Sequence, residues 1–218
     1  MVEPAELAYL VARRVAYGLS RNSVREFLGI SSKYINPLEM YLYPSPNDKC
    51  SPGDVVREKT TGSMWMVLTP ACDFENEKAE NVLLAHLNEL TNHPLYKTWV
   101  DSNAKFAQID NKHKDYKIIE TAFKDARGDV KSLVKDKKAE RYKFIPGTFF
   151  LPNCVLDFQD LKNLPLNNQD EFEQICSLDS PFREEILHLF SRYYGRIGTP
   201  DINKDDVWTI VEESFKKK

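Results

Sequence analysis

Apolar residues recur at spacings of three and four near the start of the chain, which is the period of an amphipathic helix. The pattern predicts one helix over residues 4–18 and a second, shorter helix over residues 21–29. Ser20 or Asn22 is expected to cap the second helix, and Gly29 to close it. The chain therefore opens with a short helical lead.

The pattern changes to strand character at Gly53. Three segments rich in β-branched, aromatic and other apolar residues follow, at residues 53–58, 63–70 and 80–87. Their short lengths predict a small, strongly bent sheet. The proline-rich residues 36–53 are interpreted as a loop and as the boundary between the helical lead and this sheet.

The second of these strands is apolar on both faces. On a two-residue period, Trp65, Val67 and Thr69 share one face, and Met64, Met66 and Leu68 share the other. A strand of this kind is central, with the sheet interior on one side and a helix on the other. The helix around residues 99–123 or the C-terminal helix is expected to supply that cover.

The remaining chain alternates between helical and strand character. Residues 93–140 predict a lysine-rich helical insertion with an apolar stripe that Gly128 breaks. Residues 141–152 and 154–161 return to strand character. The last two segments are helical, and Ser180 is expected to cap the first of them. The whole pattern predicts an α+β protein, with residues 1–50 as the helical lead and residues 51–218 as the β core, its insertion and its C-terminal helices.

Composition and charge limit the classes of function that this chain could have. The chain has 218 residues, 42% hydrophobic and 29% charged, which is typical of a globular protein. A net charge of −3 excludes a basic field over the whole surface. Residues 97–143 nevertheless carry 13 Lys and Arg against 8 Asp and Glu, a net of +5. A solvated helix face is the favoured interpretation, and weak, non-specific contact with nucleic-acid phosphates is the alternative.

No motif for a cofactor or a metal is present. The chain lacks a P-loop, a dinucleotide-binding glycine pattern and the common zinc and serine hydrolase motifs, so we expect no cofactor. The four cysteines form no C-x-x-C pair and are expected to be reduced thiols in a cytoplasmic protein without a membrane span. Cys72, His86 and either Cys154 or Asp157 could form a metal site only if the fold brought them together.

One segment, GDVVREKTTGSMWMVLTPACDF, resembles the start of PemK/MazF-type toxins. The resemblance implies an SH3-like β-barrel, built here from residues 52–90 and 141–160. Those ribonucleases carry an Arg-Pro just ahead of the second strand, where the arginine stabilises charge on the scissile phosphate. The matching place here is Ser63-Met64, so the resemblance implies the barrel and argues against that ribonuclease activity.

A second resemblance covers residues 52–200. The segments TPACDF, RYKFIPG with FLP, CVLDFQDL and SPFREEILHLFSRYYGRIG are similar to those of a group of uncharacterised bacterial proteins. Such proteins accompany ATPase or receiver-type partners in phage-defence-like settings. The resemblance implies a bacterial or phage origin and a protein partner of one of these types.

Several residues in these motifs are candidates for binding. Cys72 is expected to be buried and unreactive, with Asp73 capping the turn, although His86 could approach Cys72 across a hairpin and activate it. Arg with Tyr on the C-terminal helix suits phosphate, RNA or protein contacts, or else pairs with nearby carboxylates. The candidate binding residues are Thr69, Cys72, Asp73, Arg141, Asp157, Arg192, Tyr193 and Arg196.

Three functions remain open from the sequence. The leading one is a non-catalytic interaction or regulatory component of a phage-defence or toxin–antitoxin-like system, because catalytic motifs are missing and the charge is moderate. The second is a nucleic-acid-acting protein, either a divergent ribonuclease or an RNA binder. The third is a hydrolase that depends on Cys72.

Overall fold

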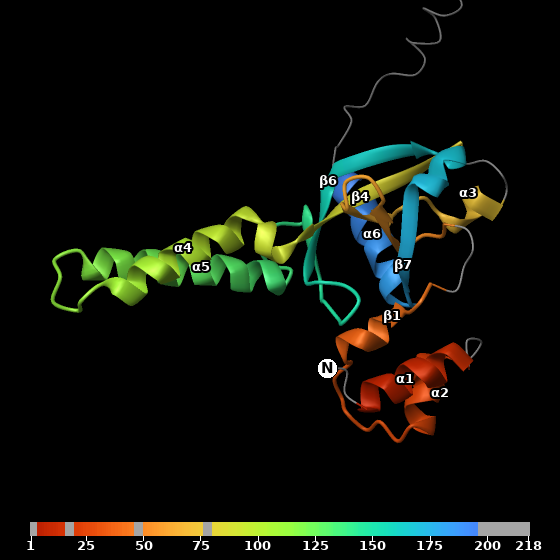
Figure 1. Ribbon diagram of the computed structural model, residues 1–218, viewed down its shortest axis with the longest axis horizontal. Helices are drawn as coiled ribbons and strands as arrows, with labels where there is room; N and C mark the ends of the chain where they lie inside the picture. The colour runs from red at the N-terminus through yellow and green to blue at the C-terminus, as the bar shows by residue number, and fades with distance from the viewer. Residues whose placement is uncertain (1–3, 16–19, 46–49, 76–79, 196–218) are drawn as a thin grey trace, which may run out of the picture.

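The computed structural model describes residues 4–15, 20–45, 50–75 and 80–195 (Figure 1). These residues form an N-terminal helical unit, a curled sheet with one helix packed on it, and a helical hairpin that extends away from the sheet. The predicted α+β class is confirmed.

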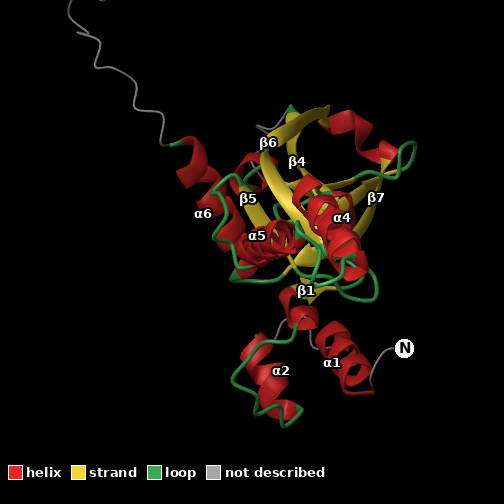
Figure 2. Ribbon diagram, turned by 90° about the vertical axis from the view of Figure 1, so that its left-hand side faces the viewer, coloured by secondary structure: helices red, strands yellow, loops and turns green. Residues whose placement is uncertain are grey.

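The sheet has seven antiparallel strands in the order β1-β7-β2-β3-β4-β6-β5. Register shifts between Val55 and Val56 and between Ala85 and His86 interrupt the pairing of β2 and β4 with their neighbours. Such irregularities increase the local twist, and the sheet curls into a half-barrel (Figure 2). The strands are β1 (Tyr41–Leu42), β2 (Asp54–Glu58), β3 (Met64–Val67), β4 (Asn81–Glu89), β5 (Tyr142–Ile145), β6 (Cys154–Pro165) and β7 (Phe172–Leu178).

The prediction that the strand around Trp65 is central is confirmed, because β3 lies between β2 and β4. The side chains on its two faces belong to different hydrophobic clusters. Met64 and Met66 join the main core, whereas Trp65 and Val67 belong to a second cluster on the opposite face. The two-residue alternation is therefore retained, with apolar contacts on both sides.

The C-terminal helix α6 (Phe182–Tyr194) covers the main core. Ile186 is buried in that core, and Phe182, Leu187 and Phe190 pack against it. Ser180 does not cap this helix as predicted, because Pro181 occupies the N-cap position. The other predicted C-terminal helix, residues 204–215, lies outside the described residues.

Segments that the sequence pattern did not predict pack against the second cluster. Strand β6 continues past the predicted end at residue 161, and Leu164 at its far end packs into the cluster. Phe172 at the start of β7 and Phe74 of the short helix α3 (Ala71–Glu75) pack there too. A 3-10 helix, η3 (Leu166–Glu171), joins β6 to β7.

Residues 93–140 are helical as predicted, but they do not cover the sheet. Helices α4 (Pro94–Gln108) and α5 (Tyr116–Val134) pack against each other and extend away from the half-barrel (Figure 1). The expectation that Gly128 breaks the helical stripe is wrong, because α5 runs through Gly128 to Val134. A glycine in an exposed helix position lowers helix stability by only about 1 kcal/mol, which the rest of the helix tolerates.

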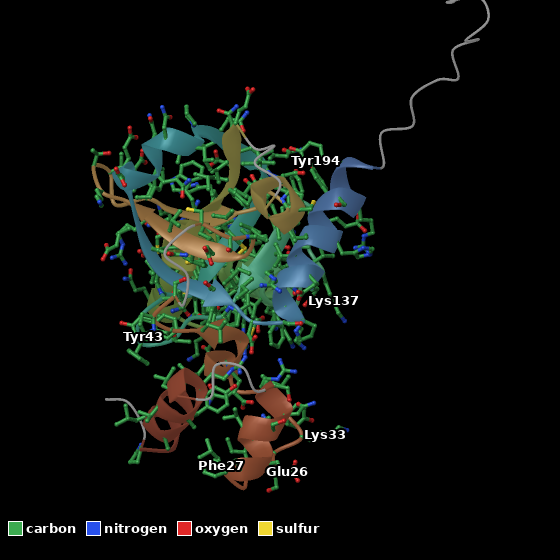
Figure 3. The ribbon with its side chains drawn as sticks, turned by 90° about the vertical axis from the view of Figure 1, so that its right-hand side faces the viewer. Glu26, Phe27, Lys33, Tyr43, Lys137 and Tyr194 are labelled. Atoms are coloured by element: carbon green, nitrogen blue, oxygen red, sulfur yellow. The ribbon has the colours of Figure 1, made fainter. Side chains whose placement is uncertain are left out.

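The N-terminal unit contains α1 (Pro4–Val15), α2 (Arg21–Phe27) and the 3-10 helix η1 (Pro37–Met40). The side chain of Ser20 caps α2 as predicted, and Gly29 follows that helix with a φ of 67°. Phe27 at the outer end of this unit is 82% exposed, whereas Tyr43 lies at the junction with the half-barrel (Figure 3). The Tyr43 ring stacks on Phe150 with 4.1 Å between ring centroids.

A buried ion pair also joins the N-terminal unit to the half-barrel. Nη2 of Arg13 donates a hydrogen bond of 2.5 Å to Oδ2 of Asp179, the residue after β7. The guanidinium of Arg21 lies 5.0 Å from the centre of the Phe182 ring at the start of α6. The helical lead is therefore attached to the end of the sheet where β7 passes into α6.

Candidate functional site

The predicted residues Arg141 and Asp157 meet where the hairpin joins the sheet. Arg141 precedes β5 and donates two hydrogen bonds to Asp157 on β6, from Nε at 2.6 Å and from Nη2 at 2.5 Å. Burial alone would raise the pKa of Asp157, but the bonds from Arg141 and from the Gln159 amide hold it below its usual range. The carboxylate is therefore ionised and fully engaged by its partners.

Two histidines lie beside this pair. Nδ1 of His86 is 2.8 Å from Oδ2 of Asp160, and its ring packs against Trp65. His93 is buried, its ring meets Tyr142 edge to face, and burial lowers its pKa. A cavity of about 210 Å³ separates these groups, lined by His86, Asn88, His93, Pro94, Arg141, Tyr142, Val155, Asp157 and Asp160.

Two more predicted residues lie on α6 and contact sequence neighbours of Asp157 and Arg141. The hydroxyl of Tyr193 accepts a hydrogen bond from Nε2 of Gln159, two residues after Asp157. Nη2 of Arg192 lies 3.7 Å from a carboxylate oxygen of Glu140. The structure therefore brings Arg141, Asp157, Arg192 and Tyr193 to one corner, where α6 crosses the β5–β6 edge of the sheet. The eighth candidate, Arg196, lies outside the described residues.

The remaining candidates lie elsewhere, beyond the end of β3. Thr69 is buried, and its Oγ1 accepts a hydrogen bond of 2.7 Å from the Leu83 amide, which joins β3 to β4. Cys72 was expected to be buried, and this is wrong. Pro70 starts a turn, closed by the Asp73 amide bonding to the Pro70 carbonyl, that exposes Cys72 on α3.

The corner does not bring Cys72 together with a base. The cavity lining includes no serine, threonine or cysteine, and Cys72 is not part of it. His86, which could have activated Cys72, is hydrogen-bonded to Asp160 instead. In the described part of the chain, no three His, Cys, Asp or Glu side chains come together in a way that could hold a metal ion.

The same corner anchors the hairpin. Nδ1 of His93 accepts a hydrogen bond from the Leu95 amide and so caps α4. Asp136, just after α5, accepts a hydrogen bond from the Phe144 amide, and Nζ of Lys143 reaches Asp136 and Glu185 at 2.8 Å each. These bonds connect the root of the hairpin to β5 and to α6. The bonds at the hairpin root therefore come from His93, Asp136 and Lys143, whereas the predicted residues Arg141, Asp157, Arg192 and Tyr193 bond within the neighbouring corner.

The hairpin itself carries a surface that the sequence reasoning missed. A groove of about 400 Å³ runs between the two helices, lined by Thr98, Asp101, Ser102, Lys105, Ile118, Ile119 and Ala122. Ile118 on its rim is 69% exposed. The signal was Ile118, an apolar residue beside the stripe position Ile119 and about 100° from it around the helix, which widens the apolar face.

A separate buried carboxylate, Asp54, lies at the start of β2. Its oxygens accept hydrogen bonds from the Ser51 amide at 2.7 Å, from Gln174 and from Ser177. Burial nevertheless raises the pKa of Asp54 to about 6. The folded state therefore holds this proton more tightly than the unfolded chain, so the stability contributed by Asp54 is present below about pH 4 and is lost as the pH rises through 6.

We expect Asp54→Asn to remove this pH dependence. The amide oxygen can accept from the Ser51 amide and Gln174, and the amide NH2 can donate to the Ser177 hydroxyl. The group carries no charge, so the variant should gain about 3 kcal/mol relative to the natural chain between pH 4 and pH 7.5. Urea unfolding at a series of pH values measures this difference. Parallel curves for the two proteins would show that Asp54 titrates normally.

Among the residues that the structure describes, no helix combines the length and the apolar character needed to cross a bilayer. Searches for related proteins add no family to these observations. No protein-family model, no curated protein and no solved structure matches the chain.

Proposed function

We propose that this protein is a non-catalytic interaction component whose docking element is the α4–α5 hairpin. The observation that carries the proposal is that the hairpin extends away from the half-barrel (Figure 1), and that no other described part of the chain covers the groove around Ile118. Among the described residues, the main contacts of the two helices outside the hairpin are with residues 90–92 and with β5, both at the root. A hairpin held in this way presents its surface to another molecule.

The energetics of the hairpin favour such a role. Helix α4 has no buried residue, and the buried residues of α5, Ala126, Val130 and Leu133, lie in the half of that helix nearer the root. Short helices in water depend on the burial of one face for most of their stability. Covering a side chain such as Ile118 contributes about 1.5–3 kcal/mol, so a docked partner would stabilise the outer half of the hairpin.

The corner at the root supports a non-catalytic function. Arg141 donates two of its hydrogen bonds to Asp157, and the cavity beside them is lined by no serine, threonine or cysteine. The corner instead provides many bonds that fix the direction of the hairpin. A rigid support is what a docking element needs, because ordering a mobile segment on binding lowers affinity.

The sequence resemblances give this proposal its setting. The TPACDF segment and the motifs that follow support a role in a phage-defence or toxin–antitoxin-like system, in the cytoplasm, with an ATPase or receiver-type protein as partner. The likeness of residues 53–74 to PemK/MazF-type toxins supports an SH3-like assignment for the curled sheet. Divergent ribonuclease activity, RNA binding and Cys72-dependent hydrolysis are the competing functions.

The test is a pull-down with the full chain and mass spectrometry, followed by isothermal titration calorimetry with the ATPase or receiver-type protein that it recovers. Ile118→Lys is expected to weaken binding at least tenfold, because it places a charge at an exposed apolar position of the docking surface. Val100→Lys is the matched control: Val100 is also an exposed apolar residue of the hairpin, but it does not line the groove. Affinity unchanged by Ile118→Lys, or RNA cleavage by the purified chain, would contradict the proposal.

A further inference from the structure

The chain leaves α6 beside the root of the hairpin. Helix α6 ends at Tyr194, whose hydroxyl donates a hydrogen bond of 2.8 Å to the Phe158 carbonyl. Two residues earlier, Nη2 of Arg192 lies 3.7 Å from a carboxylate oxygen of Glu140, in the connection between α5 and β5. The residues that follow α6 therefore start close to the place where the hairpin joins the sheet.

These later residues include segment 204–215, for which the sequence predicts a helix. At about 100° per residue, its apolar side chains fall within an arc of about 160°, and its four acidic side chains lie outside that arc. The apolar residues are Val207, Trp208, Ile210, Val211 and Phe215, and the acidic ones are Asp205, Asp206, Glu212 and Glu213. A short helix is stable in water chiefly when such an apolar face is covered, so segment 204–215 needs an apolar surface to pack on.

The groove of the hairpin is within reach of this segment. Residues 196–203 form the connection to it, and these eight residues span at most about 28 Å. Along α4, the groove begins at Thr98, about 6 Å beyond Pro94, and ends at Lys105, about 16 Å beyond it. The 12 residues of segment 204–215 form a helix about 18 Å long, which is enough to lie along this stretch.

Another apolar pocket is farther from the end of α6. It has a volume of about 360 Å³ and lies in the N-terminal unit, where Tyr9 and Leu38 line it. That unit meets the opposite end of α6, where Arg21 packs on the Phe182 ring. The length of α6 puts this junction about 20 Å from Tyr194, so the connection would be used up largely before the pocket is reached. The hairpin groove is the nearer surface.

The net charges of the two surfaces have opposite signs. Residues 94–134 of the hairpin carry 8 Lys and Arg against 6 Asp and Glu, a net of +2. Segment 204–215 carries 1 Lys against 4 Asp and Glu, a net of −3, ahead of the three lysines at residues 216–218. Salt screens exposed charges, so this attraction is weak and the apolar contact supplies most of the affinity.

We infer that segment 204–215 occupies the groove of the same chain, with its apolar face over Ile118, and that a partner protein has to displace it. The short connection holds the segment at an effective concentration of about 1 mM, so an intrinsic dissociation constant of ~100 µM fills about nine-tenths of the grooves. Partner binding is then weakened about tenfold. This inference rests on the proposed function of the hairpin as a docking element, and it adds how access to that element is regulated.

Hydrogen exchange of the full chain, followed by mass spectrometry, tests the contact. The amides of residues 207–215 should exchange about tenfold more slowly than those of an unstructured peptide, because a groove filled nine-tenths of the time leaves them open for about one-tenth of it. Ile118→Lys should remove this protection. Val100→Lys should leave it, because Val100 is an exposed apolar residue of the hairpin that does not line the groove. Free exchange of residues 207–215 in the natural chain, or protection that survives Ile118→Lys, overturns the inference.

A pair of substitutions in the segment tests the same contact from its other side. Val211→Asp places a charge in the middle of the apolar arc, whereas the control Thr209→Asp places the same charge on the opposite side of the predicted helix. Val211→Asp should remove the protection of residues 207–215 and tighten partner binding about tenfold, and Thr209→Asp should change neither. Protection that appears only as the protein concentration is raised would contradict the inference, because it would show contact between two chains.

The outcomes separate this inference from the proposed function. Ile118→Lys acts on both the segment and the partner, so its effect on the partner alone is measured in the Val211→Asp chain, where the segment no longer competes. If residues 207–215 exchange freely but Ile118→Lys still weakens partner binding, the docking function stands and the segment is not the occupant of the groove. If Ile118→Lys removes the protection but leaves partner binding to the Val211→Asp chain unchanged, the groove holds the segment and the docking function is wrong.

Discussion

Arg13→Ala is expected to lower the free energy of unfolding by about 3–5 kcal/mol. The side chains of Arg13 and Asp179 are only 8% and 11% exposed, and they form the ion pair that joins the N-terminal unit to the half-barrel. Removing the guanidinium leaves the Asp179 carboxylate buried without its cation. Urea unfolding followed by tryptophan fluorescence and by circular dichroism measures the loss.

The double variant Arg13→Met with Asp179→Leu is the matched control. An apolar pair of similar volume removes both charges, so its stability should lie within about 1 kcal/mol of the natural chain or above it. A loss of less than about 1 kcal/mol for Arg13→Ala would show that water reaches this junction and screens the carboxylate.

Trp65→Ala is expected to cost about 3–5 kcal/mol, the second large effect. Trp65 lies on the central strand β3, packs against the second hydrophobic cluster, and has the His86 ring at 4.8 Å and Nζ of Lys162 at 5.5 Å from its own ring. Removing the indole would leave a cavity next to Val67 and weaken the pairing of β3 with both β2 and β4. The melting temperature of the variant gives the measurement.

Tyr34→Ala is the control for Trp65→Ala, because Tyr34 is an exposed aromatic residue whose loss should leave the melting temperature nearly unchanged. An unchanged melting temperature for Trp65→Ala, together with lost partner binding, would contradict the packing role. It would identify this face of the sheet as the binding surface in place of the hairpin.

The elements that were predicted correctly are those whose pattern is local. The alternation around Trp65 and the three- and four-residue spacing in the hairpin follow from the strand and helix periods alone. Strand β7 was missed because Ile175, Cys176, Ser177 and Leu178 are buried in succession, so no alternation marks it. Strand β1 has two residues, too few for any period.

The site was predicted less well because it depends on contacts between distant segments. Nothing near Arg141 in the sequence shows that its partner is Asp157, and the burial of His93 depends on the position of Tyr142. The apolar stripe of residues 99–123 predicts a helix that needs cover. It does not tell whether the cover is the sheet or a second helix, and here α5 covers α4.

The order of the strands has a consequence for how the protein folds as it is synthesised. Strand β7 pairs with both β1 and β2, so Tyr41 meets Leu178 and Asp54 meets Ser177 across more than a hundred residues. Half of the sheet therefore stays incomplete until the ribosome has released residues 172–178. The hairpin, whose contacts are local, forms on a microsecond scale, whereas pairings this distant are slow. During that interval the strand edge of β2 and the apolar face later covered by α6 are open to other chains, which makes this the stage most exposed to aggregation.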